Sequence, residues 1–129
     1  MPSAHELSLE LPATQQSPRA AREAVDSLPL SNDLEATFNL RLLVTELVTN
    51  SVRHAGLSPQ DTITLDVWLV AGHVRVEVGD HGPGFPPPAL RDLPSVTSGR
   101  GLFLVDALAD RWGTDGDHGR SQVWFEIDL

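Results

Sequence analysis

The chain has 129 residues, of which 40% are hydrophobic, and a formal net charge of −9 at pH 7. That length suits one domain with one core, and the acidic balance argues against a nucleic-acid-binding protein, which usually carries a basic stripe. The sequence has no Cys, no Tyr and no Lys, which excludes disulfides, zinc–thiolate clusters and chemistry that needs a lysine amine. It shows no signal peptide and no run of about 20 apolar residues, so we expect a cytoplasmic protein without a membrane partner.

The N-terminal segment predicts one strand and one helix. Residues 6–11 alternate polar and apolar side chains, as a strand does. Ser17 is the expected N-cap of a helix and Pro18 its first residue, because proline is tolerated where no N–H is needed. Apolar residues at helical spacing extend this helix over residues 19–28, and Pro29 ends it.

A long helix, predicted from the polar residues 31–33 to about residue 55, organises the chain. Its apolar residues recur at i, i+3, i+4 and i+7, which gives it a face that packs on a core. Glu46 and Asn50 lie beside this stripe, one turn apart and about 6 Å along the axis. They either line a pocket or belong to a solvated face, and the helix by itself favours the solvated face.

The middle of the chain predicts a hairpin followed by a loop. Residues 61–70 and 73–78 alternate with period two, and Ala71-Gly72 is the tight turn between them. Five of the ten prolines fall between Pro83 and Pro94. Residues 85–98 are therefore an irregular loop, of the kind that often forms a lid or a binding segment.

The C-terminal part predicts a helix and a closing strand. Residues 98–113 begin with glycines and continue as a largely buried helix, 113–119 form a turn, and 121–129 alternate as a strand. Because the strands form hairpins rather than alternating singly with helices, we expect an α+β fold with two layers. One domain, residues 1–129, would hold a mixed, mostly antiparallel sheet covered by helices on one face.

Two glycine motifs follow the hairpin. Asp80 ends a strand, and Gly82 and Gly84 after it let the backbone approach a flat ligand whose exocyclic amine the carboxylate can bind. Alone, this motif is more typical of a plain turn. Residues 99–101, Gly-Arg-Gly, stand at a helix start, where free N–H groups and the helix dipole suit a phosphate. Alone, they are weak evidence for a phosphate site, and a capped loop is the alternative interpretation.

Together the three motifs are more specific. Glu-x-x-x-Asn on a helix, Asp-x-Gly-x-Gly after a strand and Gly-x-Gly-Leu into a helix, in that order, resemble the Bergerat ATP-binding fold of the GHKL superfamily, which includes gyrase, histidine kinases and MutL. The phrases ELVTNSVRHA, DHGPGFP and GRGLFLVDALADRWG look most like its branch of small bacterial anti-sigma factor serine kinases. The resemblance covers about residues 15–129.

The resemblance implies a role for each motif. Asn50 would bind the Mg²⁺ that bridges the ATP phosphates, and Glu46 would be the general base. Asp80 would receive the adenine amine, beside glycines 82 and 84 that let the base and ribose approach. The phosphates would lie below the lid, residues 85–98, against Gly99, Arg100, Gly101 and Leu102.

One position departs from the family pattern. The family commonly places Thr just before the closing Val-Trp, where its hydroxyl helps to hold adenine. Here that position is Gln122, preceded by Ser121, which predicts weaker adenine binding or a water in place of the hydroxyl.

The function that the resemblance implies is that of an ATP- and Mg²⁺-dependent serine/threonine protein kinase. It would act as an anti-sigma factor that phosphorylates an anti-anti-sigma (STAS-type) protein, sequesters a sigma factor and forms a homodimer. The alternative is a nucleotide-gated binding module that regulates a partner without phosphoryl transfer. A histidine kinase is not expected, because 129 residues leave no space for a helical phospho-acceptor domain.

Overall fold

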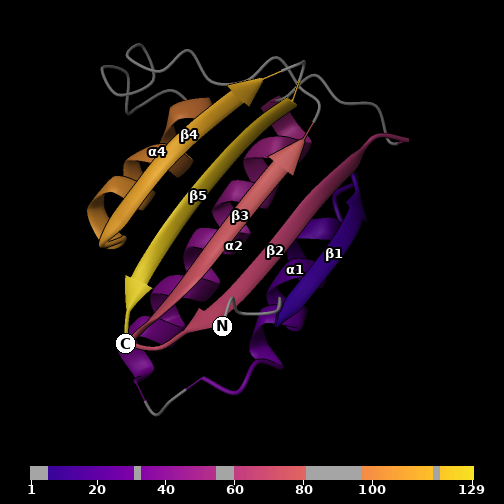
Figure 1. The fold of residues 1–129 in the computed structure, drawn as a ribbon. Coiled ribbons are helices and arrows are strands. Elements are labelled where there is room, and N and C mark those ends of the chain that lie inside the picture. Colours follow the sequence, from indigo (N-terminus) through magenta and orange to yellow (C-terminus); the bar gives the residue numbers. More distant parts are fainter. Residues whose placement is uncertain (1–5, 31–32, 55–59, 81–96, 118–119) are drawn as a thin grey trace.

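The computed structural model describes residues 6–30, 33–54, 60–80, 97–117 and 120–129, with the backbone alone at 54, 97–101, 116–117 and 120–121. In this part of the chain, three helices and five strands form two layers (Figure 1). In chain order these elements are β1 (Leu7–Pro12), α1 (Ser17–Asp26), α2 (Leu34–His54), β2 (Thr62–Val70), β3 (His73–Asp80), α4 (Thr97–Leu108), β4 (Arg111–Asp117) and β5 (Arg120–Asp128).

The described strands form one sheet in the order β1-β2-β3-β5-β4. Each of the four pairings among them is antiparallel. In Figure 1 the sheet lies in front and the helices lie behind it, so its near face carries no helix. The predicted α+β fold with helices on one face is therefore confirmed, while the sheet holds one more strand than the sequence indicated. None of the described helices is long and apolar enough to span a membrane.

The inner face of the sheet is apolar because its central strands alternate with period two. On β2, β3 and β5 alternate side chains point toward the helices, and nine of them are apolar and at most 3% exposed. These side chains are Ile63, Leu65, Val67, Val74, Val76, Val78, Val123, Phe125 and Ile127. Gly72, with φ of 89°, makes the tight turn between β2 and β3.

Helix α2 lies at the centre of the helical layer, with α1 on one side and α4 on the other (Figure 1). Asp33 caps it, since its Oδ1 accepts the Ala36 N–H at 3.0 Å. The predicted stripe is buried: Leu40, Leu43, Val44, Leu47 and Val48 are at most 2% exposed. Each such side chain contributes about 1.5–3 kcal/mol on burial, so α2 is fixed on the sheet by its own sequence pattern.

Helix α1 differs from the prediction at both ends. Its N-cap position is Gln16, without a side-chain cap bond, and Ser17 is already helical. The Ser17 hydroxyl is nearly fully buried and donates to the Pro12 carbonyl instead, so it joins the helix to the end of β1. The helix ends at Asp26, where Ser27 Oγ donates to the Ala24 carbonyl at 2.6 Å.

Strand β4 contradicts two predictions. Residues 113–119 were expected to form a turn and 98–113 a helix, but α4 ends at Leu108 and the chain is extended over Arg111–Asp117. Two features of the sequence favour the strand conformation of β4. Gly113 lets β4 pass the Trp124 indole, and Arg111 binds carboxylates of β5.

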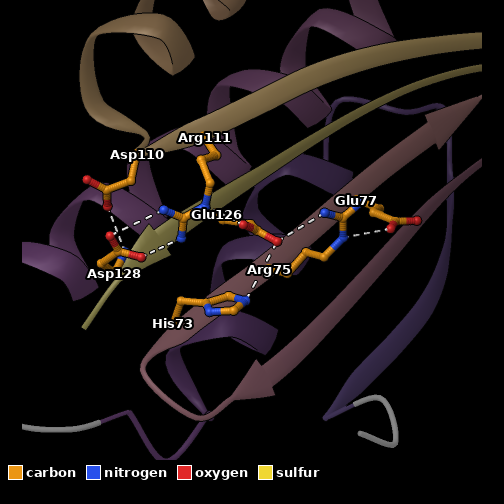
Figure 2. Close-up of polar contacts among 7 residues, drawn as sticks. All are labelled: His73, Arg75, Glu77, Asp110, Arg111, Glu126 and Asp128. Carbon is orange, nitrogen blue, oxygen red and sulfur yellow. Dashed lines mark hydrogen bonds and ion pairs between the residues drawn. The ribbon is translucent and has the colours of Figure 1, made fainter. Parts of the chain in front are cut away.

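A charged network covers the helix-free face where β3, β5 and β4 meet (Figure 2). Arg75 lies between Glu77 and Glu126, with N···O distances of 3.1 Å to each. Arg111 contacts Glu126 at 2.6 Å and Asp128 at 2.5 Å. The Arg75–Glu126 pair joins β3 to β5, and the two pairs of Arg111 hold the edge strand β4 to β5.

Candidate functional site

Three segments that are distant in sequence meet at one end of the molecule. The C-terminal ends of α2 and β3 and the N-terminal end of α4 lie at the same end of the two layers (Figure 1). Helix α2 packs against α4 and also contacts β3 and β5. The predicted motifs on α2, β3 and α4 are therefore carried by elements that touch one another.

Asn50 is 4% exposed, and its Nδ2 has no hydrogen-bond partner among the described residues. Leaving such a donor buried and unpaired costs about 1–3 kcal/mol, and an unpaired group of this kind needs an explanation such as a ligand. A carboxamide can offer its oxygen to a hard cation and its N–H to an anion. The side chain therefore fits a Mg²⁺–phosphate group.

Asp80 is the last residue of β3 and is also 4% exposed. The Ser51 hydroxyl donates to its Oδ2 at 2.7 Å, in a buried contact between α2 and β3. Ser51 was not among the predicted site residues. The signal available in the sequence was a hydroxyl inside an otherwise apolar stripe, next to Asn50.

Glu46 lies one turn before Asn50 on α2 and is half-buried. A half-buried position lets a carboxylate keep contact with water. A general base needs such access to the hydroxyl from which it takes a proton.

The second glycine motif lies inside α4 rather than before it. The helix begins at Thr97, so residues 99–101 lie within its first one and a half turns. The first N–H groups of a helix have no intrahelical partner, so the start of α4 offers donors that suit a phosphate. Gly82, Gly84 and most of the proposed lid, residues 85–98, lie outside the described residues.

Leu102 serves the core. Its side chain is 3% exposed and belongs to the main hydrophobic cluster. Any contact with a phosphate would have to come from its backbone, while its side chain packs α4 on the hydrophobic core.

Gln122 does not face Asp80. Its Nε2 donates to Glu77 Oε1 at 2.5 Å, on the helix-free side of the sheet. The register pairs Gln122 with Gly79 and pairs Ser121 with Asp80. Because neighbours on a strand face opposite sides, the departure at Gln122 lies on the wrong face to weaken a contact at Asp80.

Comparison with known proteins agrees with the fold. Residues 11–127 match the family described as "Histidine kinase-like ATPase domain". The chain is 28% identical to the serine-protein kinase RsbW of Listeria monocytogenes over 131 aligned positions, which cover 91% of this chain and 83% of that protein. It is 45% identical over 74 residues to an uncharacterised protein of Streptomyces coelicolor, covering 56% of this chain and 69% of the relative.

A solved structure has the same fold. The histidine kinase domain of the Erythrobacter litoralis EL346 blue-light activated histidine kinase superposes with a TM-score of 0.56 and 27% identity. The match covers 74% of this chain but only 45% of the longer kinase chain. The chain therefore belongs to the histidine kinase-like ATPase family, and its RsbW relatives support the predicted anti-sigma factor kinase branch of the GHKL superfamily.

Proposed function

We propose that this protein is an ATP-dependent serine/threonine protein kinase that acts as an anti-sigma factor. It phosphorylates an anti-anti-sigma protein of the STAS type and sequesters a sigma factor while that antagonist is phosphorylated. The observation that carries the proposal is the buried Nδ2 of Asn50, which has no partner among the described residues, on the helix whose Ser51 binds Asp80, in a chain of this family. The similarity to serine-protein kinases named RsbW supports the choice of substrate class.

In this proposal each motif has a defined task. Asp80 accepts the adenine amine, with Gly82 and Gly84 giving the base room, and the first turn of α4 binds phosphate oxygens through its N–H groups. Asn50 holds the Mg²⁺, which when bound neutralises phosphate charge. Glu46 takes the proton from the substrate serine hydroxyl as its oxygen receives the γ-phosphoryl group and ADP leaves.

The proposal also includes the molecular context. Residues 1–129 form a single cytoplasmic ATP-binding domain with a lid over residues 85–98, and the protein works as a homodimer. Its partners are proteins rather than nucleic acid or membrane. The net charge of −9 supports a partner with a basic surface.

Calorimetry with MgADP and MgATP tests the nucleotide site. The wild type is expected to bind both, and Asn50→Ala is expected to weaken binding about tenfold or more while the free protein keeps its stability, because the variant removes an unpaired buried donor. Thr49→Ala is the matched control, since the Thr49 hydroxyl donates to the Thr45 carbonyl of the same helix. Absence of any heat at millimolar nucleotide would overturn the proposal.

Labelled ATP tests phosphoryl transfer. Incubation with purified STAS-type proteins should label one of them on a serine or threonine, and Glu46→Ala should reduce the rate about 10²-fold or more with nucleotide affinity unchanged. Tight nucleotide binding without transfer to any candidate would contradict the kinase assignment. Regulation that survives Glu46→Ala but not Asn50→Asp would instead identify a nucleotide-gated binding module.

A further inference from the structure

The hydroxyl of Ser51 is used differently from the other hydroxyls of α2. Thr45 Oγ1 donates to the Arg41 carbonyl and Thr49 Oγ1 to the Thr45 carbonyl, both at 2.7 Å. Donation to the carbonyl four residues earlier is the usual solution for a hydroxyl within a helix. Ser51 Oγ instead donates to Oδ2 of Asp80, which lies on β3, 29 positions later in the chain.

This contact is buried on both sides. Ser51 and Asp80 are each 4% exposed. Leu47 and Val48 lie one turn before Ser51 on α2, and both are apolar and at most 2% exposed. A hydroxyl carries one hydrogen, so this bond uses the entire donor capacity of Ser51. The inner stripe of α2 thus places its one buried hydroxyl against the carboxylate at the end of β3.

We infer that Ser51 is a positioning residue for purine recognition: it fixes the Asp80 carboxylate so that the site selects a base with an amino group at C6. This inference rests on the proposed function, in which Asp80 receives the adenine amine. An ionised carboxylate only accepts hydrogen bonds, so it pairs with a 6-amino group and repels the 6-oxo group of guanine or hypoxanthine. Holding its orientation removes an ordering cost that ligand binding would otherwise carry.

The size of the effect follows from the type of bond. Removing a hydrogen bond to a charged group changes affinity by about tenfold or more when that bond orders the ligand-binding atom. The loss should appear with a ligand that has the 6-amino group and be absent with one that lacks it. That difference separates positioning from a general contribution to folding.

The experiment compares two ligands across Ser51 variants by calorimetry in Mg²⁺: ADP, and the diphosphate of purine riboside, which carries hydrogen at C6. Ser51→Ala is expected to weaken ADP about tenfold and to leave the purine analogue within about twofold. Thr49→Ala, which deletes a hydroxyl bonded to the helix backbone, should change neither affinity. Ser51→Thr, which keeps the hydroxyl, should restore the preference for ADP.

Each result decides the question. Equal weakening of both ligands by Ser51→Ala would reduce Ser51 to a structural role, and no change with ADP would remove its role altogether. If Ser51→Ala does not fold, Ser51→Cys supplies a variant of similar size with a weak donor, and an unchanged ligand ratio in it overturns the inference. Failure of the wild type to bind any nucleotide would reject the proposed function, and this inference with it, whereas wild-type binding with an unchanged ratio rejects this inference alone.

Discussion

Asn50 and Ser51 are neighbours on α2 with the same 4% exposure, but their polar groups are satisfied in different ways. Ser51 finds Asp80 within the protein, whereas Asn50 Nδ2 has no partner in the described structure. A satisfied buried group stabilises the fold, and an unsatisfied one is costly until something binds to it. This contrast is the reason that we propose a positioning role for Ser51 and a ligand-binding role for Asn50.

A substitution at Gly113 tests how much one residue contributes to the packing of the edge strand β4 on β5. A Cβ at this position would lie 2.7 Å from Trp124 Nε1, and that indole is itself held by Arg75, whose guanidinium lies 4.3 Å from the ring centroid. Gly113→Ala must therefore displace an indole that cannot move freely, and should lower the free energy of unfolding by about 1–3 kcal/mol. Urea unfolding measures this, with Thr114→Ala at an exposed position of β4 as the control. A loss for Gly113→Ala no larger than that of the control would show that the indole yields easily.

The sequence identified Glu46, Asn50 and Asp80 as candidate site residues through their motifs, but it did not identify Ser51. A serine within an apolar stripe is compatible with the buried face of a helix, and nothing local indicates its partner. The partner depends on how β3 lies against α2, which is a property of the tertiary structure. Residue identity could be predicted here, and residue pairing could not.

At the scale of elements, strict periodicity decided which predictions held. The strands expected at 61–70 and 121–129 were found at Thr62–Val70 and Arg120–Asp128. Strand β4 was missed because an edge strand with few inward contacts needs no alternating apolar pattern. Trp112 is its one side chain packed on the core among the described residues, and the attachment comes from charge pairs that no local pattern reveals.

Those charge pairs make the attachment of β4 sensitive to pH. Hydrogen bonds from Arg111 are the main cause that lowers the pKa of Glu126 below its ordinary value of 4.5, with burial opposing and Arg75 adding to the decrease. A depressed carboxylate pKa stabilises the folded state above the unfolded pKa, and this stability is lost as the pH falls through the folded pKa. The contribution of Glu126 is therefore complete at pH 7 and declines below about pH 4.5.

Glu126→Gln should remove this dependence. At pH 7 the variant should be less stable by about 1 kcal/mol, which is below the usual contribution of hydrogen bonds to charged groups because Arg111 is half exposed and solvent screens the pair. Between pH 5 and 3 its unfolding free energy, measured with urea, should fall less steeply than that of the wild type. Glu10→Gln, at an exposed position of β1, is the control. Parallel curves for Glu126→Gln and the wild type would mean that the network contributes nothing to stability.

At the scale of the whole molecule, the two ends of the layers serve different purposes. One end gathers the end of β3, the C-terminal end of α2 and the start of α4, which carry the candidate site. At the other end the charged network joins β4 to the C-terminal part of β5 (Figure 2). Hydrophobic patterning predicts the helical layer and the sheet apart from its edge strand β4, whereas the meeting of three segments at one end was indicated by family resemblance and not by spacing.

Hydrogen exchange should reveal this division when MgADP is added at about 100 times its Kd. Amides whose opening disrupts the site, in residues 46–54, 78–80 and 97–108, should exchange more slowly by up to about a hundredfold, because ligand binding stabilises only the closed state. Local openings in β1 and α1, at the far edge of the layers, should be unchanged, and they serve as the internal control. Asn50→Ala should lose the slowing in all three segments together. Slowing confined to the junction of α1 and α2 would instead place the nucleotide in the hollow of about 590 Å³ lined by Gln15, Pro18, Thr49, Val52 and Arg53.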